Sequence, residues 1–333
     1  MRRRVADSLR KFVALESSGG IALVLASVAA LVIANTPANS QFHQAIDPYH
    51  SLISQWLMAI FFFLVGLEIR NELRFGELRN PKNAAFPVIA ALGGMAAPAL
   101  IYLFINHATP AADAWAVPMP TDIALALGAL ALLGSRIDTS LKIFLLTLAI
   151  ADDLFSILVI GIFYSNSLDF GKIFATIGVV LFAIAMPEFK RFSTSTLIRI
   201  IHPWSALFII PLFALTNIGV ELDLGNIWES ISSPVSSGVI LGRVLGKIIG
   251  ITFFAWLAVQ LGIARKPSSL SFLEISGAAA LAGMGLTVSL FIAELAITDE
   301  IIIQQIKIGL VAAALISAII GILVLRKFSK AED

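Results

Sequence analysis

Apolar residues in this chain gather into long runs, and short polar segments separate one run from the next. A helix needs at least roughly 17 apolar residues to cross the hydrocarbon core of a bilayer. Ten runs qualify, at about residues 19–35, 52–69, 84–106, 114–134, 141–164, 170–187, 203–220, 235–262, 271–297 and 303–326. The pattern therefore predicts an all-α polytopic membrane protein with about ten transmembrane helices.

The composition agrees with a chain that lies mostly within the bilayer. Of its 333 residues, 58% are hydrophobic and 14% are charged, and the mean hydropathy is +0.93. We therefore expect a single transmembrane domain over residues 1–333, with little sequence left for a domain outside the membrane. The chain has no cysteine, which excludes disulfides, thiolate metal sites and cysteine nucleophiles. A net charge of +1 gives no sign of a nucleic-acid partner.

Lysine and arginine residues occur in alternate segments between the predicted helices. They are Arg2, Arg3, Arg4, Arg10 and Lys11; Arg70, Arg74, Arg79 and Lys82; Arg136; Lys190, Arg191 and Arg199; Arg265 and Lys266; and Arg326, Lys327 and Lys330. The segments 36–51, 107–113, 165–169, 221–234 and 298–302 contain neither residue type. Because basic loops stay on the cytoplasmic side, both termini are predicted to be cytoplasmic.

Helix-breaking residues interrupt two of the predicted spans. Pro118 and Pro120 precede Thr121 in the run 114–134, and Gly283 and Gly285 precede Thr287 in the run 271–297. Each interrupted helix is the middle one of a triplet, over about 84–164 and 235–326, and an odd offset of five helices inverts the second triplet. Matched broken helices in inverted triplets indicate a secondary transporter with its site at the midplane. The other helices, about 19–69 and 170–220, would form a panel beside this core.

Two adjacent carboxylates, Asp152 and Asp153, lie in the middle of the apolar run 141–164. Each costs roughly 3 kcal/mol at mid-membrane, so a chain that keeps both is expected to use them on an ion or proton path. Successive helical residues point about 100° apart, so the two cannot face one partner equally. Lys247, in the middle of the run 235–262, is a cation that could pair with one of them. A purely structural salt bridge is the alternative role for Lys247.

The first broken helix adds two polar residues to this group. Asp122 is predicted at the start of a half-helix, where it could compensate the helix dipole or bind an ion directly. Thr121 could cap that half-helix or offer its hydroxyl to the site. Hard cations take oxygen ligands, and a desolvated carboxylate also binds a proton more readily. Competition between a proton and a small cation for the same oxygens is sufficient for exchange.

Other classes of function have less support. No arrangement of serine or histidine resembles a hydrolase, and an intramembrane aspartyl protease would need a GxGD pattern that is absent. We therefore expect neither an enzyme nor a bound cofactor. A cation-coupled symporter of a small organic solute would share the architecture, and a reduced, non-transporting paralogue is a further alternative. Glu68 and Glu72 at the end of the run 52–69, with His202, are candidates for a response to pH, and Glu294 could line an exit path.

Seven segments resemble the NhaA-type sodium/proton antiporters of bacterial inner membranes. They are FFLVGLE at 62–68, AAFPVIAALGGMAAPAL at 84–100, TDIALALGALALLGSR at 121–136, LKIFLLTLAIADDL at 141–154, HPW at 202–204, PLFALTNIGV at 211–220 and GMGLTVSLFIAELA at 283–296. The resemblance implies that Asp153 is the main cation and proton site and that Asp152 pairs with Lys247. It also implies electrogenic exchange of Na⁺, or Li⁺, for a larger number of protons, by alternating access.

The chain also departs from that family. Family members have two more helices between the aspartate-bearing helix and HPW, so this chain resembles a shortened member. The loop 36–51 lacks the strand-like stretch of the family's dimer hairpin, so we expect a monomer or a weak homodimer. Ile198 replaces an acidic position near HPW, which leaves His202 as the residue there with an ordinary pKa between 6 and 8.

Overall fold

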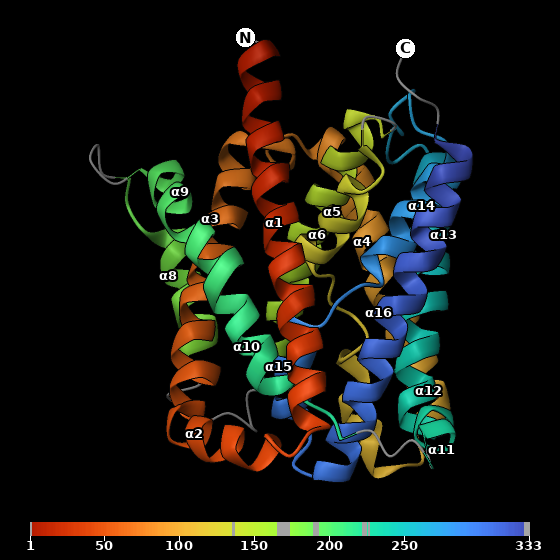
Figure 1. Ribbon diagram of the computed structural model, residues 1–333. Helices are drawn as coiled ribbons and strands as arrows, with labels where there is room; N and C mark the ends of the chain where they lie inside the picture. Colours follow the sequence, from red (N-terminus) through yellow and green to blue (C-terminus); the bar gives the residue numbers. More distant parts are fainter. Residues whose placement is uncertain are drawn as a thin grey trace.

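The computed structural model describes residues 2–134, 137–164, 174–188, 193–221, 225 and 227–329, and every regular element within them is helical (Figure 1). The first half contains α1 (Arg2–Ala34), α2 (Asn39–Ser51), α3 (Met58–Phe75), α4 (Pro81–Asn106), α5 (Ile123–Ala131) and α6 (Thr139–Phe163). The second half contains α8 (Val179–Ala185), α9 (Thr194–Trp204), α10 (Ile210–Asn217), α11 (Ile227–Ser232), α12 (Pro234–Leu241), α13 (Lys247–Gln260), α14 (Phe272–Ala282), α15 (Thr287–Ala296) and α16 (Glu300–Phe328).

Short turns of other helix types complete these elements. Four π-helical turns lead directly into α3, α8, α10 and α13; they are η1 (Leu52–Leu57), η6 (Phe174–Gly178), η7 (Ser205–Ile209) and η8 (Gly242–Gly246). Two 3-10 turns, η2 (Glu77–Arg79) and η3 (Pro110–Ala116), lie in connections. A π turn inside a helix widens it locally and often occurs at functional sites.

Within the described residues, seven helical stretches are long and apolar enough to cross a membrane. They are Leu15–Ala34, Leu52–Phe75, Pro81–Asn106, Thr139–Phe163, Thr194–Asn217, Pro234–Gln260 and Glu300–Phe328. An eighth results if α14 and α15, bent by 53° at their junction, are one broken span. The all-helical polytopic architecture is therefore confirmed.

The count of ten spans stays a prediction. The predicted run 114–134 forms two short helical pieces, and the run 170–187 is represented by a shorter apolar helix, Thr176–Ala185. Residues 165–173 lie outside the described part of the chain, as do four of the basic residues used for orientation: Arg136, Lys190, Arg191 and Lys330.

Local chemistry explains where the helices begin. Asn80 accepts a hydrogen bond from the N–H of Lys82, just before Pro81 opens α4. Ser271 and Glu274 form a reciprocal capping box at the start of α14, and the Asp299 carboxylate accepts from two N–H groups at the start of α16. Each cap satisfies N–H groups that the helix itself leaves unpaired.

Two predicted boundaries were wrong. The segment 36–51 was expected to be a loop, but most of it forms the helix α2. The predicted span 203–220 begins earlier, at α9, so that the HPW segment lies inside a helix. Ser193 caps this helix by accepting from the N–H of Thr196. Hydropathy missed the extension because the first turns of α9 are largely polar.

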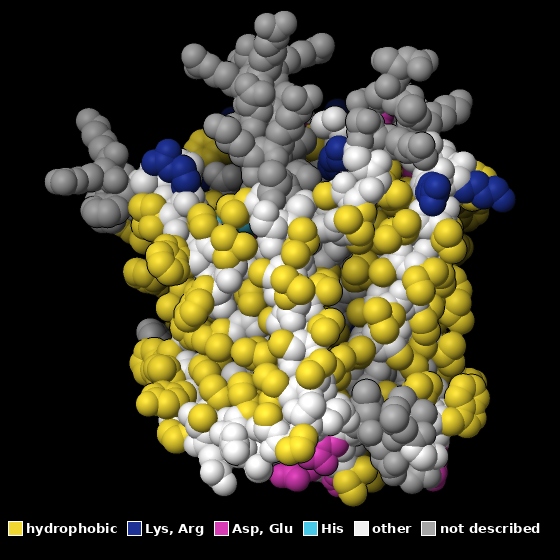
Figure 2. All heavy atoms as spheres, viewed as in Figure 1, with side chains coloured by type: hydrophobic (Ala, Val, Ile, Leu, Met, Phe, Trp, Pro, Cys, Tyr) yellow, Lys and Arg dark blue, Asp and Glu magenta, His cyan; other side chains and the backbone are white. Residues whose placement is uncertain are grey.

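The arrangement in space places both ends of the chain at the same end of the bundle (Figure 1). The face of the molecule in Figure 2 is a broad belt of hydrophobic side chains, with Lys and Arg near one end and most of the exposed Asp and Glu near the other. Helices α4 and α13 pack together, and α1 packs against α5 and α10.

Candidate functional site

The structure interrupts two helices at the positions where the sequence predicts breaks. Residues 117–122 leave the helical conformation between η3 and α5, and residues 283–286 do so between α14 and α15. The first break contains Pro118 and Pro120, and the second contains Gly283 and Gly285. Proline removes a backbone donor and glycine lowers the cost of non-helical conformations, which explains both interruptions.

Asp122 lies between the beginnings of the two half-helices. It occupies the N-cap position of α5, and its Oδ2 accepts a hydrogen bond of 3.0 Å from the hydroxyl of Thr287, the first residue of α15. Free N–H groups and the helix dipole favour a negative charge at such positions. The position suits dipole compensation, and Asp122 also lines the cavity described below.

Asp152, Lys247 and Thr121 form a buried polar cluster. Lys247 Nζ lies 2.7 Å from Asp152 Oδ2 and donates to Thr121 Oγ1 at 2.9 Å, while the Thr121 hydroxyl donates to the same Oδ2 at 2.6 Å. Asp152 and Lys247 are fully buried. The structure thus brings together, from α6, α13 and the first break, three residues that the sequence analysis singled out. Asp152 Oδ1 has no hydrogen-bond partner among the described residues.

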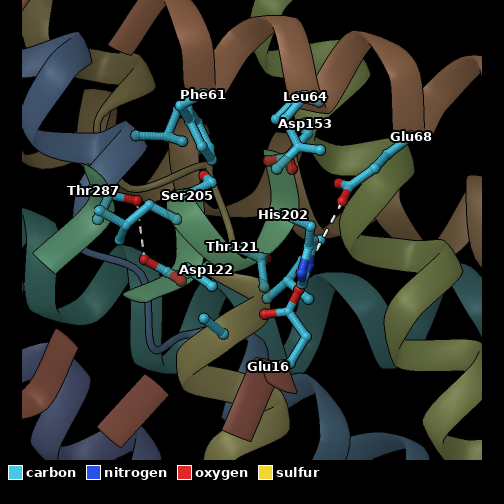
Figure 3. A pocket seen from close by; sticks show the side chains of 16 residues that line it. Glu16, Phe61, Leu64, Glu68, Thr121, Asp122, Asp153, His202, Ser205 and Thr287 are labelled. Carbon is cyan, nitrogen blue, oxygen red and sulfur yellow. Dashed lines mark hydrogen bonds and ion pairs between the residues drawn. The ribbon is translucent and has the colours of Figure 1, made fainter. Parts of the chain in front are cut away.

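Asp153 has a different environment from its neighbour. Its side chain lies at a small cavity, and its Oδ1 is buried without a hydrogen-bond partner in the described structure. The cavity has about 40 Å³ for a water-sized sphere, which is room for roughly three water molecules. Thr121, Asp122 and Thr287 also line it, and Figure 3 shows Asp153 and Asp122 at the same pocket.

A second group of titratable side chains shares this cavity. His202 Nε2 lies 2.5 Å from Glu16 Oε1 and 3.7 Å from Glu68 Oε1 (Figure 3). These residues come from α9, α1 and α3. Sequence reasoning named Glu68 and His202 but missed Glu16, which precedes the predicted first span and reads as an ordinary polar flank. Its presence in a helix that passes Asp122 could only be seen in three dimensions.

Two other candidates lie away from this cavity. The Glu72 carboxylate accepts from the N–H of Glu77 at 2.7 Å, so it fixes the turn after α3. Glu294 lines a separate cavity of about 180 Å³, together with His50, Phe62 and Phe291. The Phe62 and Phe291 rings pack with their centroids 5.1 Å apart.

Arg243 is the residue that sequence reasoning most undervalued. It lies in the π turn η8, is fully buried, and donates to the carbonyl oxygens of Val117, Pro120 and Gly283. The carbonyls freed at the two breaks could otherwise bind a cation. Three of them instead accept from this guanidinium.

The arrangement can bind a small cation through oxygen atoms. Two buried carboxylate oxygens have no partner among the described residues, and burying a carboxylate oxygen without one is costly. No three His, Cys, Asp or Glu side chains in the described part of the chain converge closely enough to hold a metal ion. A sodium-sized cation at Asp153 would therefore need hydroxyl, carbonyl or water oxygens as well.

The chain is similar to known sodium/proton antiporters. Residues 10–200 and 173–325 match the model of the family Na⁺/H⁺ antiporter 1. The chain is 38% identical to the Na⁺/H⁺ antiporter NhaA of Escherichia coli O1:K1, over 94% of this chain and 96% of that protein. NhaA proteins of Shigella dysenteriae serotype 1 and Shigella boydii serotype 4 are 37% and 38% identical over the same shares.

These alignments extend over 374 positions, whereas this chain has 333 residues, so the resemblance to a shortened member is confirmed. The family model and the relatives each match more than two thirds of the chain. The chain therefore belongs to the Na⁺/H⁺ antiporter 1 family.

Proposed function

We propose that this protein exports Na⁺, or Li⁺, in exchange for H⁺, and that this exchange is electrogenic and proceeds by alternating access. The observation that supports this most directly is the Asp153 carboxylate, which lies at a water-sized cavity with a buried, unpartnered oxygen. A proton, a sodium ion or water can each satisfy that oxygen. The names of its relatives state the same exchange of Na⁺ for H⁺.

The two adjacent aspartates divide the binding between them. Asp152 Oδ2 accepts from both Lys247 and Thr121, so that oxygen is already neutralised by a cation. Asp153 has no such partner among the described residues and is the first place for a proton or Na⁺ to bind. A cation bound at Asp153 could also reach Asp152 Oδ1, which likewise has no hydrogen-bond partner among the described residues. Because one ion displaces the other, a carrier that reorients only when loaded performs exchange.

The inverted triplets, about 84–164 and 235–326, would supply the reorienting elements, with 19–69 and 170–220 as the panel. The two breaks support this part of the proposal because they meet in space. Asp122 in the first break accepts from Thr287, which directly follows the second, and Arg243 donates to carbonyls in both. Binding sites between broken helices of inverted repeats are typical of secondary transporters.

We place the protein in a bacterial inner membrane with both termini cytoplasmic. The chain ends at the same end of the bundle as it begins, and exposed Lys and Arg lie near that end. This distribution agrees with the retention of basic residues on the cytoplasmic side. A monomer or a weak homodimer stays a prediction.

Replacing Asp153 tests the proposal. Asp153→Asn should abolish sodium-dependent proton movement, because an amide can neither ionise to bind Na⁺ nor release a proton. The assay follows the collapse of a pH gradient in everted vesicles when Na⁺, Li⁺, K⁺ or Ca²⁺ is added. Asp47→Asn, at an exposed carboxylate of α2, is the matched control and should behave as wild type.

Two outcomes would contradict the proposal. Exchange at a near wild-type rate by Asp153→Asn would remove this residue from the mechanism. A wild-type protein that moves no protons on addition of Na⁺ would instead favour the reduced paralogue, or a symporter if an organic solute then stimulates sodium uptake.

A further inference from the structure

The buried Arg243 makes four hydrogen bonds, and together they join three separate parts of the chain. Nε donates to the carbonyl of Gly283 at 3.0 Å, and Nη2 donates to the carbonyl of Pro120 at 2.6 Å. Nη1 donates to the carbonyl of Val117 at 3.3 Å and to the hydroxyl of Ser289 at 2.5 Å. One guanidinium therefore links η8 to both breaks and to the first turn of α15.

Two of the acceptors lie where helices end. Val117 is the C-cap of η3, and Gly283 is the C-cap of α14. The last carbonyls of a helix lack intrahelical donors and carry partial negative charge, so a cation is favourable there. Gly285 is needed for this approach, because a Cβ atom at that position would overlap Arg243 Nη2.

The same contacts fix two hydroxyl groups at the cavity. Pro120 immediately precedes Thr121, whose hydroxyl donates to Asp152. Gly283 begins the second break, which ends immediately before Thr287, and the Thr287 hydroxyl donates to Asp122. Both threonines line the cavity at Asp153, whereas Arg243 does not. The guanidinium therefore lies outside the cavity and contacts the two segments that carry these threonines.

Lys247 cannot take over this task. It lies four residues after Arg243 and uses its ammonium group on Asp152 and Thr121. A lysine at position 243 could not replace the arginine either, because one ammonium nitrogen cannot reach, in a fixed plane, three carbonyls from two segments.

We propose that Arg243 is a positioning residue for ion binding: its planar guanidinium fixes the two breaks relative to each other and so sets the affinity of the Asp153 site for Na⁺. This inference rests on the proposed function. It adds that the ion's affinity depends on a residue that never touches the ion.

The experiment measures sodium-driven proton movement in proteoliposomes against Na⁺ concentration, for wild type, Arg243→Lys and Ser289→Ala. Loss of such a supporting contact typically weakens metal binding by about 10- to 100-fold. Arg243→Lys should therefore raise the apparent KM for Na⁺ by at least about tenfold, while the rate at saturating Na⁺ falls by less than about threefold. Ser289→Ala removes the hydrogen bond between Arg243 and the Ser289 hydroxyl and keeps the three bonds to carbonyls of the breaks. The KM of this variant should stay within about twofold of wild type.

A merely structural role predicts another pattern. In that case Arg243→Lys lowers thermal stability but leaves the KM of the folded fraction unchanged, and the inference is overturned. If Arg243→Lys yields no folded protein, Gly285→Ala serves instead, because its Cβ pushes on the guanidinium and on the Pro120 carbonyl without changing any charge. An unchanged KM in that variant also overturns the inference. Sodium-dependent exchange by wild type separates either result from a failure of the proposed function.

Discussion

Lys247 and Asp152 are an ion pair with no exposure to solvent, and their atoms meet at 2.7 Å. Taking both charges out of water costs several kcal/mol per ion, and close approach with added hydrogen bonds offsets that cost. Thr121 supplies one such bond to each partner. Removing one charge alone would leave the other buried and uncompensated.

This contact gives the first prediction at the residue scale. Asp152→Asn and Lys247→Met should each lower the free energy of unfolding by about 3–5 kcal/mol, and the double variant should recover part of that loss. Thermal unfolding in detergent completes the double-mutant cycle. The pair Asp47→Asn and Lys247→Met is the control, and its effects should simply add, because Asp47 is exposed in α2. A coupling energy near zero for Asp152 and Lys247 would show that they do not stabilise each other.

The charged residues of the site divide into those the sequence could reveal and those it could not. Asp152, Asp153 and Lys247 were recognisable because ionisable groups are rare in the middle of apolar runs. The partners of Arg243 were not, because three of the four are backbone carbonyls, and these belong to two breaks that lie far apart in the sequence. Which carbonyls a guanidinium meets depends on how the breaks cross, and side-chain patterns do not encode that directly.

At the scale of elements, α4 and α13 approach each other unusually closely. A Cβ atom on Gly250 would overlap the carbonyl group of Gly93, and one on Gly246 would come within 2.8 Å of the backbone of Pro98. Small residues at such interfaces let helix backbones touch, which replaces the missing hydrophobic driving force inside a bilayer. Lys247 lies between the two glycines, so this packing also sets the position of its side chain relative to Asp152.

Gly250→Ala should therefore separate the two helices. We expect a loss of about 1–3 kcal/mol in the free energy of unfolding, as for other overpacked positions. Gly128→Ala is the matched control, since its Cβ would meet its nearest atom at 3.6 Å, an ordinary contact distance. Thermal unfolding of both variants in the same detergent gives the comparison. Equal stability of Gly250→Ala and Gly128→Ala would contradict the close approach.

The helices themselves were largely foreseen, but their ends were not. Hydropathy finds the stretch that a membrane would cover and ignores polar turns beyond it, so it missed both the start of α9 and the whole of α2. Caps such as Ser193 mark the true starts. The breaks at 117–122 and 283–286 were foreseen because proline and glycine act through the backbone at the position where they occur.

At the scale of the whole molecule, one cavity joins groups from several helices. Glu16 and His202 share it with Asp153, although their helices are far apart in the sequence. Two accounts of the pH response follow from this. Protons could compete with Na⁺ at Asp153 alone, or the Glu16–His202–Glu68 group could act as a separate sensor. Competition needs no further residue and follows from the proposed mechanism, so we expect it to set the response.

The last prediction separates these accounts. With competition alone, the apparent KM for Na⁺ should rise by up to about tenfold for each unit by which the cytoplasmic pH falls, because one proton excludes one ion. His202→Gln keeps a polar side chain beside Glu16 but cannot ionise, and it should shift this curve by less than about half a pH unit. The measurement is apparent sodium affinity against pH in everted vesicles, with His43→Gln, an exposed histidine of α2, as the control. A displacement of a full pH unit by His202→Gln, but not by His43→Gln, would mean that a separate cytoplasmic sensor operates.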